Sequence, residues 1–443
     1  MVEFNESVTL CFNTSMPGKK FIYPCLTPLF MEYYPRKIEE KLDKWLGRRE
    51  VIVIKGPRQS GKTTLLLHLS EKLSGRYVTL EDDEMLRALE NAPKEFADRF
   101  LEEKILFIDE AQYCKDVGKK IKLIYDLFSN RLKVFLTGSG SFDIKVEVGK
   151  HLVGRGVFFE LLPLDFEEFL MWKARDLHSL FSEYRRALTD FILAGEESSV
   201  NIAFEREFKT LLNEYLVFGG FPAIVKESDQ EIKKQLLKSL VQTYLEKDVF
   251  FFLNIRHIEK FRNLLQYLSF NIGSILEASS IMSEFKMDFK TVESYLAILE
   301  NTYLIYLVKP FYKNLATELK KARKIYFTDT GLRNAVINNF VQFESRTDKG
   351  SLIENFVLNE LKANLEGEFR YWRTTGKAEV DFIIKLNSEV IPVEVKTRGK
   401  LERGFRSFLE AYKPKKAVVF TEDRFGFETI GETRILYAPY FFI

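Results

Sequence analysis

A short stretch early in the chain has the residue types and spacing of a phosphate-binding loop. It fits the pattern G-x4-G-K-T and comprises Gly56, Pro57, Arg58, Gln59, Ser60, Gly61, Lys62, Thr63 and Thr64. An apolar run at 51–54 precedes it and an amphipathic segment at 63–73 follows it, which is the strand–loop–helix context that the pattern needs. In such loops backbone N–H groups surround the phosphates, the lysine reaches the β- and γ-phosphates, and the threonine after it ligates Mg²⁺. We therefore expect these residues to bind ATP; a Gly-rich turn that matches by chance is the alternative.

A pair of acidic residues follows a second apolar run. Residues 105–108 are all apolar, which predicts a strand buried on both faces, and Asp109 and Glu110 come directly after it. Open α/β sheets bind ligands at the carboxyl ends of their strands. We expect Asp109 to hold Mg²⁺ through water and Glu110 to polarise the attacking water. The alternative is that the two acids cap the next helix.

Two further residues are candidates for sensing the γ-phosphate. A third expected strand, at 133–136, is followed by Thr137, Gly138 and Ser139. A polar residue at this position would contact the γ-phosphate or water, and a Ser/Gly-rich turn is the alternative. Arg155 lies between two glycines and would serve as an arginine finger, either in its own subunit or in a neighbouring one. Action on a neighbour requires a homo-oligomer, and an ordinary surface arginine is the alternative.

Near the C-terminal end, two predicted strands flank a turn at 387–388. If these are the central turn residues, the numbers of paired positions sum to 775, so Asp381 lies opposite Glu394 and Glu379 lies opposite Lys396. Opposed side chains have Cβ atoms about 4.5–5.5 Å apart, so two carboxylates repel each other unless a cation joins them. We expect Mg²⁺ or Mn²⁺ between Asp381 and Glu394, with Lys396 stabilising charge on a phosphate. The alternative is a surface ion pair between Glu379 and Lys396, with Asp381 solvated.

The spacing Asp-x12-Glu-x-Lys at 381, 394 and 396 resembles the core of the PD-(D/E)xK nucleases, notably the archaeal Holliday-junction resolvases. That resemblance implies a further glutamate on the preceding helix, a position that Glu354 fits. Ser351 and Glu354 also match a capping box, which is the alternative role for Glu354. Residues 396–416 contain eight Lys or Arg against two Glu, and this balance favours a nucleic-acid substrate. We expect Glu354, Asp381, Glu394 and Lys396 to be the catalytic residues of this site.

The region at 261–343 has the pattern of a winged helix. Helices are expected near 261–272, 278–285 and 289–301, with Asp288 capping the third, and β-rich runs follow at 304–308 and 324–327. Residues 307–334 contain seven Lys or Arg against Glu318 and Asp329, which suits contacts with DNA phosphates. The alternative is a module for protein–protein contact.

The predicted fold class is α/β, with a P-loop, AAA-type parallel sheet and a helical lid, then a winged helix, then an α/β restriction-endonuclease-like domain. The expected boundaries are 1–32 for an N-terminal arm, 33–260 for the ATPase core with its lid, 261–343 for the winged helix and 344–443 for the nuclease-like domain. The first thirty residues are polar and aperiodic, and Met31 is a candidate natural start.

The composition is that of a globular protein without a membrane span. Hydrophobic residues make up 46% and charged residues 29%, and the formal net charge is +2. No apolar run approaches the roughly 20 residues that cross a bilayer. The three cysteines and four histidines show no disulfide or metal-binding spacing, which indicates a reducing, cytoplasmic compartment.

Residues 33–430 resemble one prokaryotic, archaea-rich family along their length. The matching segments are 56–64, 107–112, 136–139, 152–156, 160–164, 218–222, 379–382 and 393–396. The family consists of AAA-like P-loop ATPases with a winged helix and a C-terminal restriction-endonuclease-like domain of unknown function. The resemblance implies a Mg²⁺–ATP-dependent core whose fourth strand ends in Thr137 and whose finger candidate is Arg155.

Two functions follow from these features. The first is an ATPase that couples its nucleotide state, ATP or ADP, to a DNA-contacting, metal-dependent nuclease-like domain. The second is a nucleotide-controlled regulatory switch in which the winged helix is an interaction surface and the C-terminal domain is catalytically inert.

Overall fold

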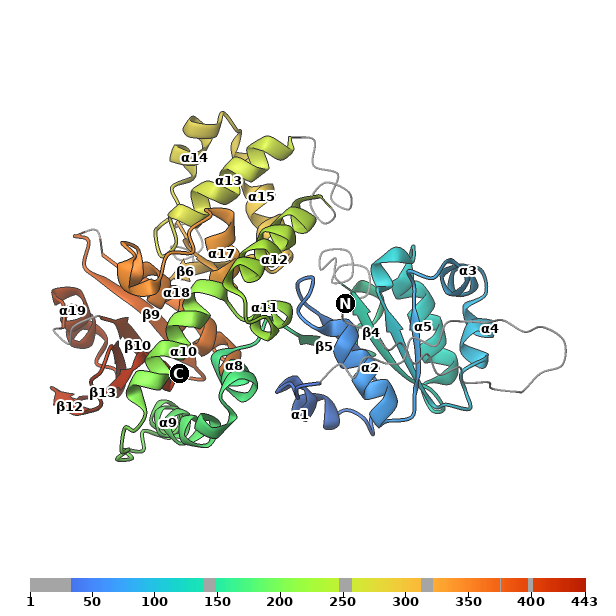
Figure 1. The fold of residues 1–443 in the computed structure, drawn as a ribbon, viewed down its shortest axis with the longest axis horizontal. Coiled ribbons are helices and arrows are strands. Elements are labelled where there is room, and N and C mark those ends of the chain that lie inside the picture. The colour runs from blue at the N-terminus through green and yellow to red at the C-terminus, as the bar shows by residue number, and fades with distance from the viewer. Residues whose placement is uncertain (1–32, 139–148, 247–256, 312–321, 375, 397–400) are drawn as a thin grey trace, which may run out of the picture. The chain divides into compact units, whose positions relative to one another are not determined.

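The computed structural model describes residues 33–138, 149–246, 257–311, 322–374, 376–396 and 401–443 (Figure 1). Residues 36–443 form one compact unit, and residues 1–35 belong to another. The predicted N-terminal arm at 1–32 and the candidate start at Met31 therefore lie outside the described residues, as does Ser139. None of the helices in the described ranges is long and apolar enough to cross a membrane.

The first sheet has five parallel strands in the order β2-β3-β4-β1-β5. The strands are β1 Val51–Lys55, β2 Arg76–Thr79, β3 Ile105–Asp109, β4 Lys133–Gly138 and β5 Gly156–Glu160. The helices that accompany them are α1 Ile38–Asp43, α2 Lys62–Lys72, α3 Asp83–Asn91, α4 Pro93–Asp98, α5 Val117–Phe128 and α7 Gly149–His151. The chain passes from β1 through α2 to β2 at the edge of the sheet, and then back toward β1 through α3 and α4 to β3 and through α5 to β4. Because crossovers between parallel strands are right-handed, these opposite directions place α2 on one face of the sheet and α3–α5 on the other.

The positions of the three central strands explain why their sequences are apolar. Every residue of β1 is buried, and β3 and β4 are buried from their second residue onward, because helices cover both faces of the sheet. Parallel strands all point the same way, so β1, β3 and β4 end at one edge. This edge receives the phosphate loop, Asp109 and Thr137.

Five helices follow the first sheet: α8 Phe166–Lys173, α9 Arg175–Ala194, α10 Glu205–Phe218, α11 Pro222–Lys226 and α12 Gln230–Thr243. The sequence predicts them as a lid of the ATPase core. Their apolar faces instead share one continuous core with residues from 261–443, whereas the first sheet has a separate core of its own. The helical prediction is confirmed, but these helices pack with the C-terminal half of the chain.

Two consecutive glycines connect α10 to α11 at a point of very close packing. A Cβ on Gly219 would lie 2.2 Å from Asp329 Oδ1, and a Cβ on Gly220 would lie 2.0 Å from Leu164 O. Gly219 has φ +75°, a left-handed conformation that glycine adopts without strain. Asp329 is buried and accepts N–H bonds from Gly220 and Leu332. Burial raises the pKa of Asp329 to about 6.

The next elements are α13 Ile258–Phe270, α14 Ala278–Phe285, α15 Phe289–Asn301, β6 Ile305–Pro310 and β7 Lys324–Phe327. Asp288 caps α15 by accepting the Thr291 N–H bond, as predicted. Strands β6 and β7 are antiparallel, and Ile275 forms an isolated bridge with Lys324. The order of three helices and a hairpin is thus present, but most of the segment joining its two strands, 312–321, lies outside the described residues.

The second sheet has eight strands in the order β12-β13-β11-β10-β9-β8-β6-β7. Its further strands are β8 Glu368–Arg373, β9 Glu379–Leu386, β10 Glu389–Val395, β11 Lys416–Thr421, β12 Gly426–Ile430 and β13 Thr433–Pro439. Strand β6 pairs in parallel with β8, so the sheet crosses the predicted boundary at 343/344.

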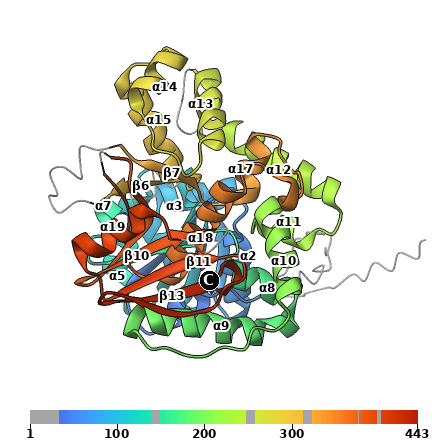
Figure 2. The ribbon, with the colours of Figure 1, turned by 90° about the vertical axis from the view of Figure 1, so that its left-hand side faces the viewer.

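Helices lie along both faces of this sheet, and the remaining elements join its ends. The helices are α17 Thr330–Val336, α18 Lys349–Asn364 and α19 Arg403–Tyr412, with 3-10 turns at Ala111–Tyr113, Phe343–Ser345 and Tyr440–Phe442 along the chain. Val393, Val418 and Leu436 enter the core that contains α9 and α18, whereas Ile383, Val419 and Ile435 enter a core with α19. Figure 2 shows α9 alongside β13.

Candidate functional site

Asp109 is the centre of the first candidate site and lies at the carboxyl end of β3. Its side chain is 1% exposed. Oδ2 accepts the Thr63 hydroxyl at 2.7 Å and the Tyr77 hydroxyl at 2.9 Å. Oδ1 accepts the Thr137 hydroxyl and, at 3.0 Å, the Glu110 backbone N–H. The structure therefore brings together three residues that the sequence places in different motifs: Thr63, Asp109 and Thr137.

The phosphate loop folds as a cradle between β1 and α2. Gly61 precedes α2 with φ +95°, and a Cβ on Gly56 would lie 2.1 Å from Leu161 O, so both positions require glycine. The buried Lys62 donates to Gly56 O at 3.1 Å and to Pro57 O at 2.6 Å. Its ammonium group thus lies against the loop that would surround a phosphate.

One polar atom inside this loop tests the fit of a nucleotide. Ser60 is completely buried, and its Oγ has no hydrogen-bond partner among the described residues. A buried hydroxyl without a partner costs about 1–3 kcal/mol, and a phosphate oxygen would accept its hydrogen. Arg58 and Thr64 are half-buried and Gln59 is exposed. The loop therefore fits a bound phosphate chain, with Thr63 and Asp109 in place for the accompanying Mg²⁺.

Glu110, the predicted water-orienting residue, has a backbone conformation that is rare for glutamate. Its φ is +54°, and its carboxylate accepts the Gln112 side-chain N–H. Non-glycine residues in the left-handed region concentrate at functional sites, where surrounding structure maintains them. The αL turn after Asp109 begins the short helix at Ala111–Tyr113 rather than a capped α-helix.

Tyr77 is a residue of this site that the motifs do not identify. It lies on β2, whose Thr79 is in register with Asp109 on β3, and alternate residues of a strand share a face. Burial and the neighbouring Asp109 carboxylate raise the pKa of Tyr77, so its hydroxyl stays protonated and donates. One feature of the sequence could have identified Tyr77 as a site residue: it lies near the end of a predicted strand, and that strand neighbours the one that ends in Asp109.

Arg155 lies at the opposite edge of the sheet from the phosphate loop. Its carbonyl accepts the N–H of Val51, the first residue of β1, whereas the loop follows the last residue of that strand. A five-residue strand spans about 17 Å. The Arg155 side chain pairs with Asp126 at 2.9 Å. In its own subunit Arg155 is therefore not placed as a finger, and its action on a neighbouring subunit stays a prediction.

The second candidate site is formed by the β9–β10 hairpin. The observed pairs run from Glu389–Leu386 to Val393–Phe382, so the predicted sum of 775 is confirmed. The next pair is Asp381 and Glu394. The Asp381 N–H donates to Glu394 Oε2 at 3.4 Å, and the Val395 N–H donates to Asp381 Oδ2 at 2.8 Å. The two opposed carboxylates thus accept backbone N–H groups from each other's strands.

Two lysines neutralise the carboxylates of the hairpin. Lys396 pairs with Glu394 at 3.0 Å and with Glu402 at 2.8 Å. The alternative considered for this hairpin, an ion pair between Glu379 and Lys396, is not the one observed, because Glu379 contacts Lys324, and Arg373 at 3.4 Å. Lys324 comes from β7, a strand that the hairpin sequence alone does not bring close.

Glu354 lies on α18 and contacts the same lysine. Its Oε1 accepts from Lys324 Nζ at 3.1 Å and from the Tyr326 hydroxyl. The capping box of Ser351 and Glu354 does not form, because α18 begins two residues earlier, at Lys349, after Asp348. Glu354 therefore does approach the hairpin, as the nuclease resemblance implies, but a lysine lies beside it.

Two carboxylates of this second site, Asp381 and Glu394, have raised pKa values. Burial and the neighbouring Glu354 and Glu394 raise the pKa of Asp381 well above its ordinary value, against the opposing effect of Lys324 and Lys396. Burial also raises the pKa of Glu394 to about 7. In the described part of the chain, no three acidic, histidine or cysteine side chains are grouped so that they hold a metal ion.

The structure divides the two predicted basic regions into buried and exposed residues. In 307–334, Lys324 and Arg333 are buried, Arg323 pairs with Glu293, and Lys313, Lys320 and Lys321 lie outside the described residues. The predicted wing patch therefore contributes only Lys309 as an exposed cation in the described ranges. In the described part of 396–416, which leaves out 397–400, the exposed cations are Arg403, Arg406, Lys413 and Lys415, on and directly after α19.

Comparison with known families decides the nature of the first site. Residues 48–170 match the AAA domain family. The chain contains an AAA-type P-loop ATPase domain. This AAA domain includes the phosphate loop, Asp109, Glu110 and Thr137, and it ends within α8.

The rest of the chain matches two families of unknown function. Residues 209–342 match the family DUF8612, and residues 349–441 match the family DUF4143. The first match extends from α10 to beyond α17 and crosses the predicted boundary at 260/261. The second begins with α18 and includes strands β8–β13, so it contains the carboxylates at 354, 381 and 394.

Similar sequences occur in archaea and bacteria. An uncharacterized protein of Methanocaldococcus jannaschii is 29% identical over 440 residues, which cover 94% of this chain and 92% of the relative. An uncharacterized protein of Haemophilus influenzae is 25% identical over 77% of this chain and 81% of the relative. The similarity therefore extends well beyond the AAA domain.

Two solved structures show weaker similarity. One is a STAND (Signal Transduction ATPase with Numerous Domains) protein with a tetratricopeptide repeat sensor from Pyrococcus horikoshii. It is 16% identical, with a TM-score of 0.27, and the match covers 75% of this chain and 46% of that structure. The other is PCH-2 of C. elegans, 15% identical over 45% of this chain and 56% of that structure, with a TM-score of 0.24.

Proposed function

We propose that the AAA domain binds Mg²⁺–ATP and hydrolyses it, and that its nucleotide state is coupled to the C-terminal half of the chain. The observation that carries the first part is the contact of Thr63 and Thr137 with the two oxygens of Asp109. Lys62 and the loop would hold the phosphates, Thr63 and Asp109 would hold Mg²⁺, and Glu110 would orient water. The metal supplies charge stabilisation at the transferred phosphoryl group.

Hydrolysis of ATP by the full chain, measured with Mg²⁺ and with EDTA, tests this proposal. We expect hydrolysis to need Mg²⁺ and to fall by about 100-fold or more in Lys62→Ala and Asp109→Asn, because each change removes one electrostatic contact with the phosphates or metal. Arg48→Ala is the matched control, since Arg48 is exposed and contacts Glu50 and the Trp45 ring, away from the phosphate loop. Equal hydrolysis by wild type and Lys62→Ala would overturn the proposal.

For the C-terminal half, we propose contact with DNA through α19. The support is the group of exposed cations on and after this helix, together with the ion pair between Lys396 and Glu402, the residue that precedes it. Phosphate contacts make affinity fall steeply with salt. Filter binding of duplex DNA between 50 and 200 mM salt, with the double change Arg403→Ala and Arg406→Ala, measures this slope. A slope near zero in the wild type would refute the DNA contact.

We further propose that the hairpin carboxylates, with Lys396, form a nuclease-like site on this surface. The hydrogen bonds that link Asp381 and Glu394 across the hairpin, with Lys396 two residues after Glu394, support it. Cleavage of linear, single-stranded and four-way-junction DNA, with Mg²⁺ or Mn²⁺, with and without ATP, tests the activity beside Asp381→Ala. Cleavage that persists in this variant would exclude the site.

One observation favours a second candidate, a nucleotide-controlled switch with an inert C-terminal domain. Lys324 lies between Glu354 and Glu379, where its ammonium group supplies the positive charge that a metal ion would otherwise supply. This candidate predicts no cleavage of any DNA and a large difference between the ATP and ADP states. Partial proteolysis with ATP, with ADP and without nucleotide measures that difference, and identical patterns would exclude the switch.

A further inference from the structure

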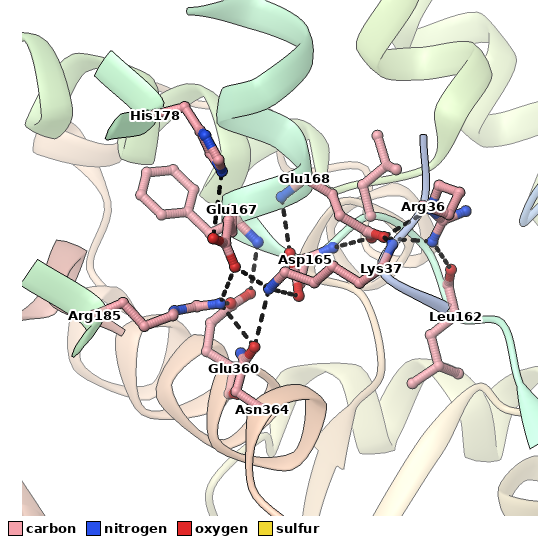
Figure 3. A network of polar contacts seen from close by, with 12 residues as sticks. Arg36, Lys37, Leu162, Asp165, Glu167, Glu168, His178, Arg185, Glu360 and Asn364 are labelled. Carbon is pink, nitrogen blue, oxygen red and sulfur yellow. Dashed lines mark hydrogen bonds and ion pairs between the residues drawn. The ribbon is translucent and has the colours of Figure 1, made fainter. Parts of the chain in front are cut away.

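Arg36 is a buried arginine that contacts the phosphate loop from outside. It is 7% exposed. Its Nη1 donates to Ser60 O, in the phosphate loop, at 2.9 Å, and its Nη2 donates to Leu162 O at 2.8 Å. Its Nε and Nη2 also donate to the two carboxylate oxygens of Glu168 at 3.0 and 3.1 Å (Figure 3). A planar guanidinium that bonds both oxygens of a carboxylate is fixed in orientation.

These contacts use four of the five N–H groups that a guanidinium offers. Arg36 is therefore committed to protein oxygens and acts on a nucleotide through the loop, not by contact. Ser60 directly precedes Gly61, whose φ of +95° sets the turn into α2. The position of Ser60 O thus reports the conformation of the loop residues that would surround the phosphates.

The carboxylate that receives Arg36 belongs to the first turn of α8. Glu168 forms a capping box with Asp165, and its Oε1 also accepts the Lys37 backbone N–H at 2.9 Å. Lys37 Nζ donates to Asp165 Oδ2 at 2.7 Å and to Asn364 Oδ1, on α18, at 3.0 Å (Figure 3). A rotation of the Arg36–Glu168 pair would therefore move groups that bond to α18.

A second contact joins the same turn to α18. The Phe166 N–H donates to Glu360 Oε1 at 3.0 Å, and Glu360 is 1% exposed. Arg185 on α9 pairs with the other oxygen of Glu360 at 3.1 Å. Helix α18 also carries Glu354, which contacts Lys324 at the hairpin carboxylates. Polar contacts thus connect the phosphate loop with α18, and this helix itself leads from Glu360 to Glu354 at the second candidate site.

We propose that Arg36 is a positioning residue that couples occupancy of the phosphate loop to α18. The proposal rests on nucleotide binding by the AAA domain and names the route by which that binding reaches the C-terminal half. Binding of a phosphate chain that shifts Ser60 O changes the bonds of Arg36 to Leu162 and Glu168. These bonds set the position of the α8 turn on α18. Contiguous contacts of this kind carry coupling when the elements that they join move together.

Hydrogen exchange of peptides within 352–364, measured in the full chain with and without Mg²⁺–ATP, tests the coupling directly. We expect nucleotide to change the exchange of these peptides in the wild type. In Arg36→Lys, which keeps the charge but cannot bond both Glu168 oxygens, we expect this change to disappear. ATP should still bind within about threefold, while kcat falls about tenfold through misplacement of the loop. Arg48→Lys, the same substitution at an exposed site, is the control.

Glu168→Gln is the second variant, for the case in which Arg36→Lys does not fold. It keeps the Arg36 contacts with Ser60 and Leu162 and weakens the bonds of residue 168 to Arg36, Lys37 and Asp165, so it should retain hydrolysis but lose the α18 response. The proposal is overturned if the wild type binds ATP without any change in α18, or if the change persists in both variants. Absence of ATP binding by the wild type would instead refute the proposed ATPase function.

Discussion

The Tyr77 hydroxyl and the Thr63 hydroxyl both donate to Oδ2 of Asp109, at 2.9 and 2.7 Å. Thr63 belongs to the phosphate loop, whereas Tyr77 comes from the strand on the other side of Asp109. The tyrosine therefore helps to fix the orientation of this carboxylate from the neighbouring strand β2. Groups that hold a metal-binding carboxylate in this way contribute to metal affinity without touching the metal.

Tyr77→Phe tests this role with the loss of one oxygen atom. We expect apparent Mg²⁺ affinity in ATP hydrolysis to fall about 10-fold, because the freed carboxylate oxygen is no longer fixed. A Mg²⁺ titration of the hydrolysis rate at saturating ATP measures this. Tyr125→Phe, at a half-buried tyrosine on α5, is the control and should leave the titration unchanged. An unchanged titration in Tyr77→Phe would show that Thr63 and Thr137 alone orient Asp109.

Gly219→Ala should destabilise the chain far more than Gly154→Ala. Both glycines have positive φ, +75° and +70°, which costs about 1–2 kcal/mol for a residue with a Cβ, and Gly219 also has ψ −169°, in a region that essentially only glycine occupies. A Cβ at 154 meets nothing within 4 Å, whereas one at 219 would lie 2.2 Å from Asp329 Oδ1. We expect a further loss of about 1–3 kcal/mol from this overlap. Urea unfolding of the two variants measures the difference, and equal losses would contradict the close approach.

The free energy of unfolding should depend on pH through Asp329. Its pKa of about 6 in the folded protein lies above the ordinary 3.8, so the folded state binds more protons than the unfolded state between these values. Its stabilising contribution is complete below pH 4 and is lost as the pH rises through about 6, by up to roughly 3 kcal/mol. The difference in unfolding free energy between wild type and Asp329→Asn should therefore shrink or reverse from pH 4.5 to 7. A difference that is constant with pH would show that Asp329 is ionised throughout.

Removal of the Lys324 ammonium group should be strongly destabilising. Lys324 is 2% exposed and contacts the half-buried Glu354 and Glu379, so Lys324→Met removes an ion pair from each carboxylate, at a cost of about 3 kcal/mol. Lys385→Met is the matched control, because Lys385 pairs with the exposed Glu368 and should lose at most about 1 kcal/mol.

The double variant Lys324→Met with Glu354→Gln separates charge from packing. A neutral residue at 354 does not require the positive charge of Lys324. We therefore expect the losses in unfolding free energy of the two single variants to sum to at least about 1 kcal/mol more than the loss of the double variant. Urea unfolding of the four proteins gives this coupling energy. Additive losses would mean that Lys324 stabilises β7 through its packing and not through its charge.

Sequence patterns predicted the features of the structure that depend on neighbouring residues in the chain. The register of the β9–β10 hairpin followed from its two turn residues, and Asn387 has the left-handed backbone that such a turn needs, with φ +52°. The phosphate loop and the strand before Asp109 followed from the motif and the apolar run, because a central parallel strand has no solvent face.

Contacts between distant segments were not predictable from such patterns. The approach of Lys324 to the hairpin depends on the pairing of β6 with β8, and β8 begins well after the β6–β7 hairpin. The helices at 166–243 have amphipathic sequences. Such a pattern predicts that one face of a helix is buried, but it does not identify the core in which that face is buried. Counting charges in 307–334 also failed to separate Arg333, which is buried, from Lys309, which is exposed.

The order of strands in the two sheets has a consequence for synthesis on the ribosome. All five strands of the first sheet lie before residue 161, so the AAA sheet can close while the C-terminal half is still being translated. In the second sheet, β13 lies between β11 and β12, and β11 is exposed along one edge until residues 433–439 emerge. Unpaired strand edges are sites of aggregation. Nascent chains that stall between β11 and β13 should therefore be the ones that most need a chaperone.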